Sequence, residues 1–170
     1  MMSPVIDNAG KVELESVLAS HAGDPAVLAL TEKLSTSIQS AKFDRNELTL
    51  TISREDIVAV CQAVQASGYN FLADVTCVDW YPNQPRFQVT YHILSHGLKR
   101  RLRLCVLVEE GDPSVDSITT VWPAANFYER EIFDLFGARF GGHPNMRRIL
   151  LPEEFQGNPL RKDFPVEGYR

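Results

Sequence analysis

The densest group of side chains that could do chemistry is the run Glu-Arg-Glu-Ile-Phe-Asp at residues 129–134. If this run is helical, Glu131 and Asp134 project together, and Arg130 lies one turn before Asp134. Paired carboxylates can act as general acid and base when burial separates their pKa values. Catalysis would also need a pocket and an orienting histidine or metal, which the sequence does not show. We therefore expect an exposed or partner-facing charged surface, with Arg130 paired locally.

The histidines and the basic run predict structural roles. His143 lies in a turn rich in glycine and proline, where we expect it to hydrogen-bond backbone groups and fix the turn. His92 and His96 are four residues apart, but on a strand or turn, so zinc binding is not expected. The basic run at residues 99–103 has no interleaved aromatic residues that could stack on bases. This run is expected to form a solvated sheet face or a partner contact.

Other features exclude whole classes of function. The chain contains no dinucleotide fingerprint, no P-loop, no nucleophile elbow and no zinc-protease motif. Its cysteines, Cys61, Cys77 and Cys105, are odd in number and far apart, which argues against a zinc ribbon, an iron–sulfur cluster or a disulfide scaffold. The net charge of −5 weakens any claim on nucleic acid or an anionic membrane. We expect buried free thiols in a reducing cytoplasm, no secretory signal and no membrane span.

Hydrophobic periodicity predicts the elements that position these residues. The chain has 170 residues, 44% of them hydrophobic, which is typical of one globular domain. The patterns predict helices at about 11–20, 25–33, 53–67 and 125–136, a hairpin over 37–52, and strands at about 71–80, 86–95 and 98–109. We predict an α+β fold in which a mixed β-sheet of about five to six strands has helices packed on one side. An irregular extended C-terminal arm follows the sheet.

The helix predicted at 125–136 carries the charged run. Asn126 and Glu129 have the spacing of an N-cap residue and its N3 partner, and Gly137 is expected to end the helix. Apolar residues at i, i+4, i+7 and i+8 predict one core-facing stripe formed by Tyr128, Ile132, Leu135 and Phe136.

All periodicity ends near residue 140, so we divide the chain into a single α+β domain (1–140) and an extended arm (141–170). The arm holds four of the ten prolines, which disfavour regular ladders. It also carries six large apolar residues without helical or strand spacing: Leu150, Leu151, Phe155, Leu160, Phe164 and Tyr169. Such a segment must lie on its own domain or on a partner. We expect a slightly basic arm that is mobile until it wraps another protein.

A long run of residues resembles a known family. The run from Trp122 to Gly137 (WPAANFYEREIFDLFG) is similar to the signature of the C subunit of NADH–quinone oxidoreductase, the 30 kDa subunit family of respiratory complex I. The similarity continues through the arm, notably in the run Pro-Leu-Arg-Lys-Asp-Phe-Pro at 159–165. The signature residues that we assign to a partner interface are Glu129, Arg130, Glu131, Asp134, Gly137, His143, Pro144, Arg147, Arg148, Pro159, Arg161, Lys162, Asp163, Phe164 and Pro165.

The resemblance implies a hydrophilic subunit of the peripheral arm, without a redox centre or catalytic residues of its own. It would pack beside the hydrogenase-large-subunit-like (49 kDa) subunit near the quinone site, peripherally on the cytoplasmic face of the bacterial inner membrane. The complex transfers electrons from NADH through FMN and iron–sulfur centres to quinone and couples this to proton translocation. FMN, the Fe–S clusters, NADH and quinone would belong to the complex, and this chain would bind no cofactor and no nucleic acid.

Three alternatives stay open. The chain could be the equivalent module of a membrane-bound hydrogenase or an F420 dehydrogenase. It could be a free-standing enzyme that uses Glu129, Glu131 or Asp134 in a concave pocket. It could also be an RNA-binding module that acts through residues 99–103. Many members of the family continue beyond the position of residue 169, so we expect either a short member or a truncated chain.

Overall fold

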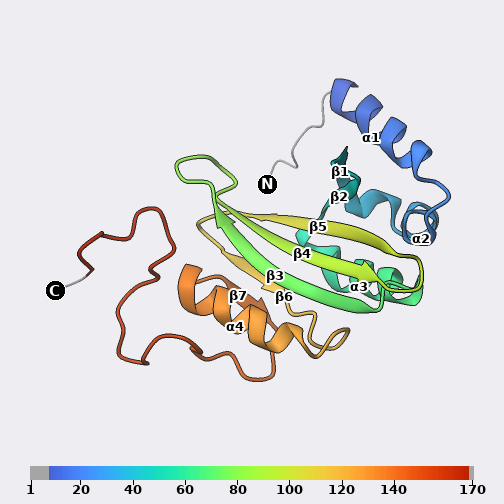
Figure 1. Cartoon of the computed structure of the whole chain (residues 1–170). Coiled ribbons are helices and arrows are strands. Elements are labelled where there is room, and N and C mark those ends of the chain that lie inside the picture. Colours follow the sequence, from blue (N-terminus) through green and yellow to red (C-terminus); the bar gives the residue numbers. More distant parts are fainter. Residues whose placement is uncertain (1–7, 169–170) are drawn as a thin grey trace.

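The computed structural model describes residues 8–168, so Tyr169 and Arg170 of the predicted arm lie outside the described residues (Figure 1). Four α-helices are described: α1 (Asn8–Ser20), α2 (Pro25–Lys33), α3 (Ile57–Ala66) and α4 (Ala125–Phe136). Short 3-10 helices lie at Ser35–Ser37 and Arg54–Asp56. The strands are β1 (Ile38–Asp44), β2 (Glu47–Ile52), β3 (Phe71–Asp79), β4 (Phe87–Ser95), β5 (Arg100–Val108), β6 (Ser114–Asp116) and β7 (Arg139–Gly141).

The main sheet is mixed and has five strands in the order β1-β2-β5-β4-β3. Strand β2 runs parallel to β5, and the other neighbouring pairs are antiparallel. Strands β6 and β7 form a separate two-stranded parallel sheet. The predicted α+β class and mixed sheet are therefore confirmed.

One face of the main sheet carries the hydrophobic core. Alternate residues of β4, from Phe87 to Ile93, are buried, as are Leu102 and Leu104 of the neighbouring β5. Helices α3 and α4 pack on this side (Figure 1). Helix α3 buries one apolar stripe, formed by Ile57, Val60, Cys61 and Val64. The alternating buried side chains of the strands and the apolar stripe of α3 therefore belong to one core between the sheet and the helices.

The structure confirms some of the predicted helix ends and contradicts one predicted cap. Helix α2 begins at its predicted residue, Pro25, and the Asp24 Oδ1 atom caps it by accepting the Ala26 N–H at 2.9 Å. Gly137 ends α4 in the left-handed region with φ 78°. The predicted cap by Asn126 and Glu129 is wrong. The N-cap residue of α4 is Ala124, which makes no side-chain cap, and Glu129 bonds to residues outside the helix.

After β7 ends at Gly141, residues 142–168 form turns and irregular chain without a further helix or strand. In Figure 1 this orange-to-red segment passes α4 and then runs to the end of the molecule that carries the C-terminus. Within residues 8–168, no helix has the length and apolar character needed to cross a membrane. We call residues 142–168 the C-terminal segment.

Candidate functional site

Asp134 of α4 fastens the C-terminal segment to the domain. Its side chain has no exposed surface. The Oδ2 atom accepts the backbone N–H groups of Ile149, Leu150 and Leu151 at 3.0, 2.8 and 2.9 Å. The Oδ1 atom accepts Arg148 Nη1 at 2.7 Å. Burial raises the pKa of Asp134, but these four donors outweigh burial and hold the pKa below its usual range. The carboxylate is therefore a charged anchor for three successive backbone amides.

Further bonds join the same part of the segment to α4. The guanidinium of Arg130 donates to the carbonyls of Arg147 and Arg148, both at 3.1 Å. The Asn158 side-chain amide donates to the Asp134 carbonyl at 3.0 Å, and the Leu160 N–H donates to the Leu135 carbonyl at 3.1 Å. Carbonyls in the last turn of a helix lack partners within the helix. The segment supplies such partners.

Gly137 lies where the segment passes close to the end of α4. A Cβ atom at this position would lie 2.7 Å from Asn158 Oδ1, in addition to the cost of a positive φ. We predict that Gly137→Ala lowers the free energy of unfolding by about 2 kcal/mol, measured by urea denaturation. Gly68→Ala is the matched control, because Gly68 also has a positive φ (96°) but open space at the Cβ position. Equal losses in the two variants would contradict a close contact with Asn158.

A second anchor forms around Arg86, at the start of β4. Its side chain is only 1% exposed and makes a bidentate pair with Asp79, with Nε–Oδ1 2.9 Å and Nη2–Oδ2 2.8 Å. Asp163 of the C-terminal segment pairs with the same guanidinium through Nη2–Oδ1 at 2.6 Å and Nη1–Oδ2 at 3.0 Å. Glu110 makes a further ion pair with Nη1. We call Arg86, Asp79, Glu110 and Asp163 the Arg86 cluster.

Backbone and aromatic contacts complete this cluster. The Lys162 N–H donates to Asp79 Oδ2 at 2.8 Å. Arg161 pairs with Glu110 at 2.9 Å, and its guanidinium lies 5.2 Å from the centre of the Phe87 ring. Burial raises the pKa of Asp79, but bonds from Arg86 and from two backbone N–H groups outweigh burial and lower the pKa strongly. Residues 161–163 are thus tied to the ends of β3 and β4.

Glu129 belongs to neither anchor. It is fully buried, and its carboxyl accepts Ser117 Oγ at 2.6 Å and the Ile118 N–H at 2.8 Å. Burial raises the pKa of Glu129 to about 7, although both bonds oppose the shift. Glu131 is exposed on the same helix. The three acidic residues of α4 therefore have separate environments, and the expected exposed charged surface is wrong for Glu129 and Asp134, which are buried.

The raised pKa of Glu129 predicts a pH dependence of stability. Between pH 5 and 7 the folded chain binds this proton more tightly than the unfolded chain, so the free energy of unfolding falls as the pH rises. The contribution is complete below the usual carboxyl pKa of 4.5 and is lost as the pH passes about 7. We expect a decrease of up to about 3 kcal/mol. Asp79 and Asp134 have lowered pKa values, so their contributions fade only at more acidic pH.

Chemical denaturation at pH 5, 6 and 7 measures this dependence. Glu129→Gln should abolish most of the slope because the amide does not titrate. Glu131→Gln, on the exposed face of α4, should retain it. A slope that survives in Glu129→Gln would assign the effect to another group.

His143 accepts the Asn145 N–H on Nδ1 at 3.0 Å, so its Nε2–H faces the Asn126 carbonyl at 3.3 Å, and the expected backbone-binding role is confirmed. The remaining signature residues are exposed or half-buried: Glu131, Pro144, Arg147, Pro159, Lys162, Phe164 and Pro165. Five residues that complete the contacts above are absent from the predicted set: Asp79, Arg86, Glu110, Ser117 and Asn158.

The structure gives the C-terminal segment two anchors within its own chain, whereas the expectation that it is mobile until a partner binds stays a prediction. The apolar side chains of the C-terminal segment are only partly buried. Phe155 stacks on Phe164 with the ring centres 6.1 Å apart. Leu150 and Leu160 remain 60% and 49% exposed. The segment is therefore held in place while it presents apolar side chains to the outside. Within the described residues, no group of three or more His, Cys, Asp or Glu side chains could hold a metal ion.

The structure is thus an α+β domain whose C-terminal segment is held by two anchors within the chain. A family model described as respiratory-chain NADH dehydrogenase, 30 kDa subunit, matches residues 50–170. The chain belongs to this family, which confirms the resemblance seen in the sequence.

Individual relatives agree with this assignment. The C subunit of the NADH-quinone oxidoreductase of Geobacter metallireducens is 46% identical, and the match covers 84% of this chain and 90% of the relative. The same subunit of Roseiflexus castenholzii is 42% identical, with 84% of each chain covered. The trypsin-resistant fragment 1–134 of Nqo5 has a TM-score of 0.62 at 33% identity and covers 68% of this chain and 95% of its own.

A structure of the membrane-bound sulfane sulfur reductase, an archaeal respiratory membrane complex, shares the fold. It has a TM-score of 0.72 at 24% identity, with 85% of this chain and 86% of the other covered. The match extends over more of this chain than the match to the Nqo5 fragment does.

Proposed function

We propose that this chain is a scaffold subunit of the peripheral arm of NADH:quinone oxidoreductase, on the cytoplasmic face of the bacterial inner membrane. It holds no redox centre and no catalytic residue. Its C-terminal segment docks on the hydrogenase-large-subunit-like (49 kDa) subunit near the quinone site. NADH, FMN, the iron–sulfur clusters and quinone are bound by other subunits of the complex.

The observation that carries this proposal is the family match over residues 50–170, which includes both anchors and the whole C-terminal segment. The signature residues with the most hydrogen bonds act within the chain: Asp134, Arg148 and Asp163 fix the path of the segment. Binding then requires little further ordering of the segment, so less conformational entropy is lost on association. The exposed Leu150 and Leu160 are the apolar contacts that such a surface offers.

Purification of the tagged chain from its native membranes tests the assignment. We expect the other peripheral subunits to co-purify, together with NADH oxidation coupled to quinone reduction. Recovery of the chain alone would overturn the proposal. The alternative module of a membrane-bound hydrogenase or an F420 dehydrogenase would give a complex that oxidises hydrogen or reduced F420 instead of NADH.

The docking role of the segment has its own test. Leu150→Asp with Leu160→Asp should leave the isolated chain folded, because both side chains are exposed, but should reduce incorporation into the complex at least tenfold. Leu28→Asp on α2 is the matched control, since Leu28 is 49% exposed and lies outside the segment. Normal incorporation of the double variant would show that the segment is not the docking surface.

A further inference from the structure

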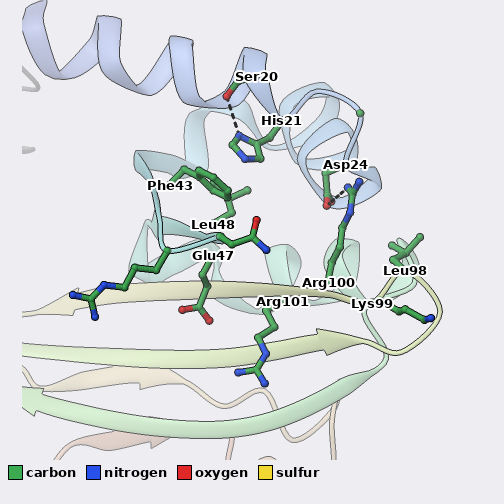
Figure 2. A pocket seen from close by; sticks show the side chains of 13 residues that line it. Ser20, His21, Asp24, Phe43, Glu47, Leu48, Leu98, Lys99, Arg100 and Arg101 are labelled. Carbon is green, nitrogen blue, oxygen red and sulfur yellow. Dashed lines mark hydrogen bonds and ion pairs between the residues drawn. The ribbon is translucent and has the colours of Figure 1, made fainter.

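A hollow of about 730 Å³ lies at the opposite end of β4 and β5 from the Arg86 cluster (Figure 2). Three connections and the element ends beside them line it: the α1–α2 link at 20–24, the β1–β2 turn with its flanking strand ends at 43–48, and the β4–β5 turn with the start of β5 at 98–101. Figure 2 shows Arg100 and Asp24 on one side, with Lys99 on the adjacent turn. The signature residues and the C-terminal segment contribute nothing to the lining.

The charges of this hollow do not balance. Its lining contains four basic residues, Arg45, Lys99, Arg100 and Arg101. It contains two acidic residues, and each already has a partner. Asp24 accepts Arg100 Nη1 at 2.8 Å and the Tyr69 hydroxyl at 2.7 Å. Glu47 pairs with Arg103, which extends from the outer face of the sheet. Both carboxylates are thus neutralised locally.

Three cations remain without an opposite charge. Within residues 8–168, Arg45, Lys99 and Arg101 form no ion pair. Two arginines outside the hollow, Arg86 and Arg148, are paired with carboxylates. The chain as a whole carries a net charge of −5, so this basic hollow differs in sign from the protein around it. It therefore favours a negatively charged occupant.

Apolar groups lie beside these cations. Phe43 and Leu98 are 47% and 40% exposed in the lining. The His21 ring packs on Phe43 with the ring centres 4.4 Å apart, and Figure 2 shows both facing the hollow. An occupant that combines acidic and apolar groups would satisfy both kinds of side chain. A bare inorganic anion would leave the apolar groups uncovered.

The backbone also argues against a phosphate site. Phosphate sites commonly use N–H groups at a helix N-terminus, but the Ala26 N–H in the first turn of α2 is already bonded to Asp24. The unpaired cations come from the β1–β2 turn, the β4–β5 turn and the start of β5, and they do not form a single cradle. We propose that the hollow binds an acidic polypeptide segment, with apolar side chains among its carboxylates, from a neighbouring subunit. This inference rests on the proposed assembly and adds a second contact at the other end of the sheet.

Chemical labelling of the purified complex tests the inference. The Lys99 amine should react with an acylating reagent at least fivefold more slowly in the complex than in the isolated chain, because the partner covers it. A carbodiimide should join Lys99 directly to an Asp or Glu of another subunit. Unchanged reactivity of Lys99, or protection without a link to a carboxylate, would overturn the inference. Neither result would bear on the assignment to the complex, because the co-purification experiment tests that assignment separately.

A titration of the isolated chain separates the possible ligands. The probe is a synthetic Glu-Asp-Phe-Glu-Asp-Leu peptide at low ionic strength, with pyrophosphate and a single-stranded RNA oligonucleotide as competitors. We expect peptide binding that weakens at least tenfold in Lys99→Glu/Arg101→Glu. The control Lys33→Glu/Lys42→Glu makes the same charge change outside the lining and should bind as the parent chain does. Preferential binding of pyrophosphate or RNA, or equal losses in both variants, would overturn the inference.

Discussion

Replacing Arg86 with methionine is expected to lower the free energy of unfolding by about 3–5 kcal/mol, because the change strands a buried charge. Asp79 is fully buried, and Arg86 supplies two of its hydrogen bonds. Without the guanidinium, the Asp79 carboxylate must either stay charged in a poorly solvated site or take up a proton. Asp163 would also lose its bidentate partner, so residues 161–163 should detach.

Urea denaturation measures the loss, and Arg54→Met is the matched control. Arg54 pairs with Asp112 at 2.9 Å, but both side chains are accessible to solvent. Exposed pairs of this kind contribute little to stability, so the control should remain close to the parent chain. Similar behaviour of the two variants would mean that Arg86 does not hold a buried ionic cluster.

Asp134→Ala is expected to release the C-terminal segment and to lower the free energy of unfolding by about 2–4 kcal/mol. The substitution removes the acceptor of three backbone N–H groups and of Arg148. Buried donors without partners are costly, so the segment should open locally to let water reach them. Amide hydrogen exchange at residues 149–151 should become at least tenfold faster, while the amides of β4 stay protected.

Glu131→Ala provides the control on the same helix. Glu131 is exposed, and substitutions at such positions usually change stability by less than about 0.5 kcal/mol. Its exchange pattern should match that of the parent chain. If Asp134→Ala left the exchange at residues 149–151 unchanged, the carboxylate could not be the anchor of the segment.

The elements of the fold could be read from the sequence because their signals are local. Helix α4 was predicted at its observed bounds, since its apolar stripe and the stop at Gly137 depend only on neighbours along the chain. The same holds for α2, where Asp24 and Pro25 mark the start. The predicted cap of α4 is wrong because the Glu129 carboxyl bonds to groups outside the helix. The carboxyl binds Ser117 and Ile118, which lie before the helix on a connection without periodicity.

The anchors could not be read from the sequence because their partners are distant. Arg86 and Asp163 are 77 positions apart, and no local pattern indicates that an arginine at the start of a strand is buried. Asp134 looked like part of an exposed charged surface, as most acidic residues on a helix are. Its burial depends on three N–H groups from an irregular segment 15–17 residues later. The family resemblance pointed to Asp134 and Asp163 without giving their roles, and it did not point to Arg86.

Hydrogen exchange of the isolated chain tests the central claim, a C-terminal segment held by its own domain, most directly. The amides of Ile149, Leu150 and Leu151 donate to Asp134, and those of Leu160 and Lys162 donate to Leu135 and Asp79. We predict that all five exchange at least tenfold more slowly than in an unstructured peptide of the same sequence. Exchange at the peptide rate, while the amides of β4 and β5 remain protected, would show that the segment is ordered only by a partner.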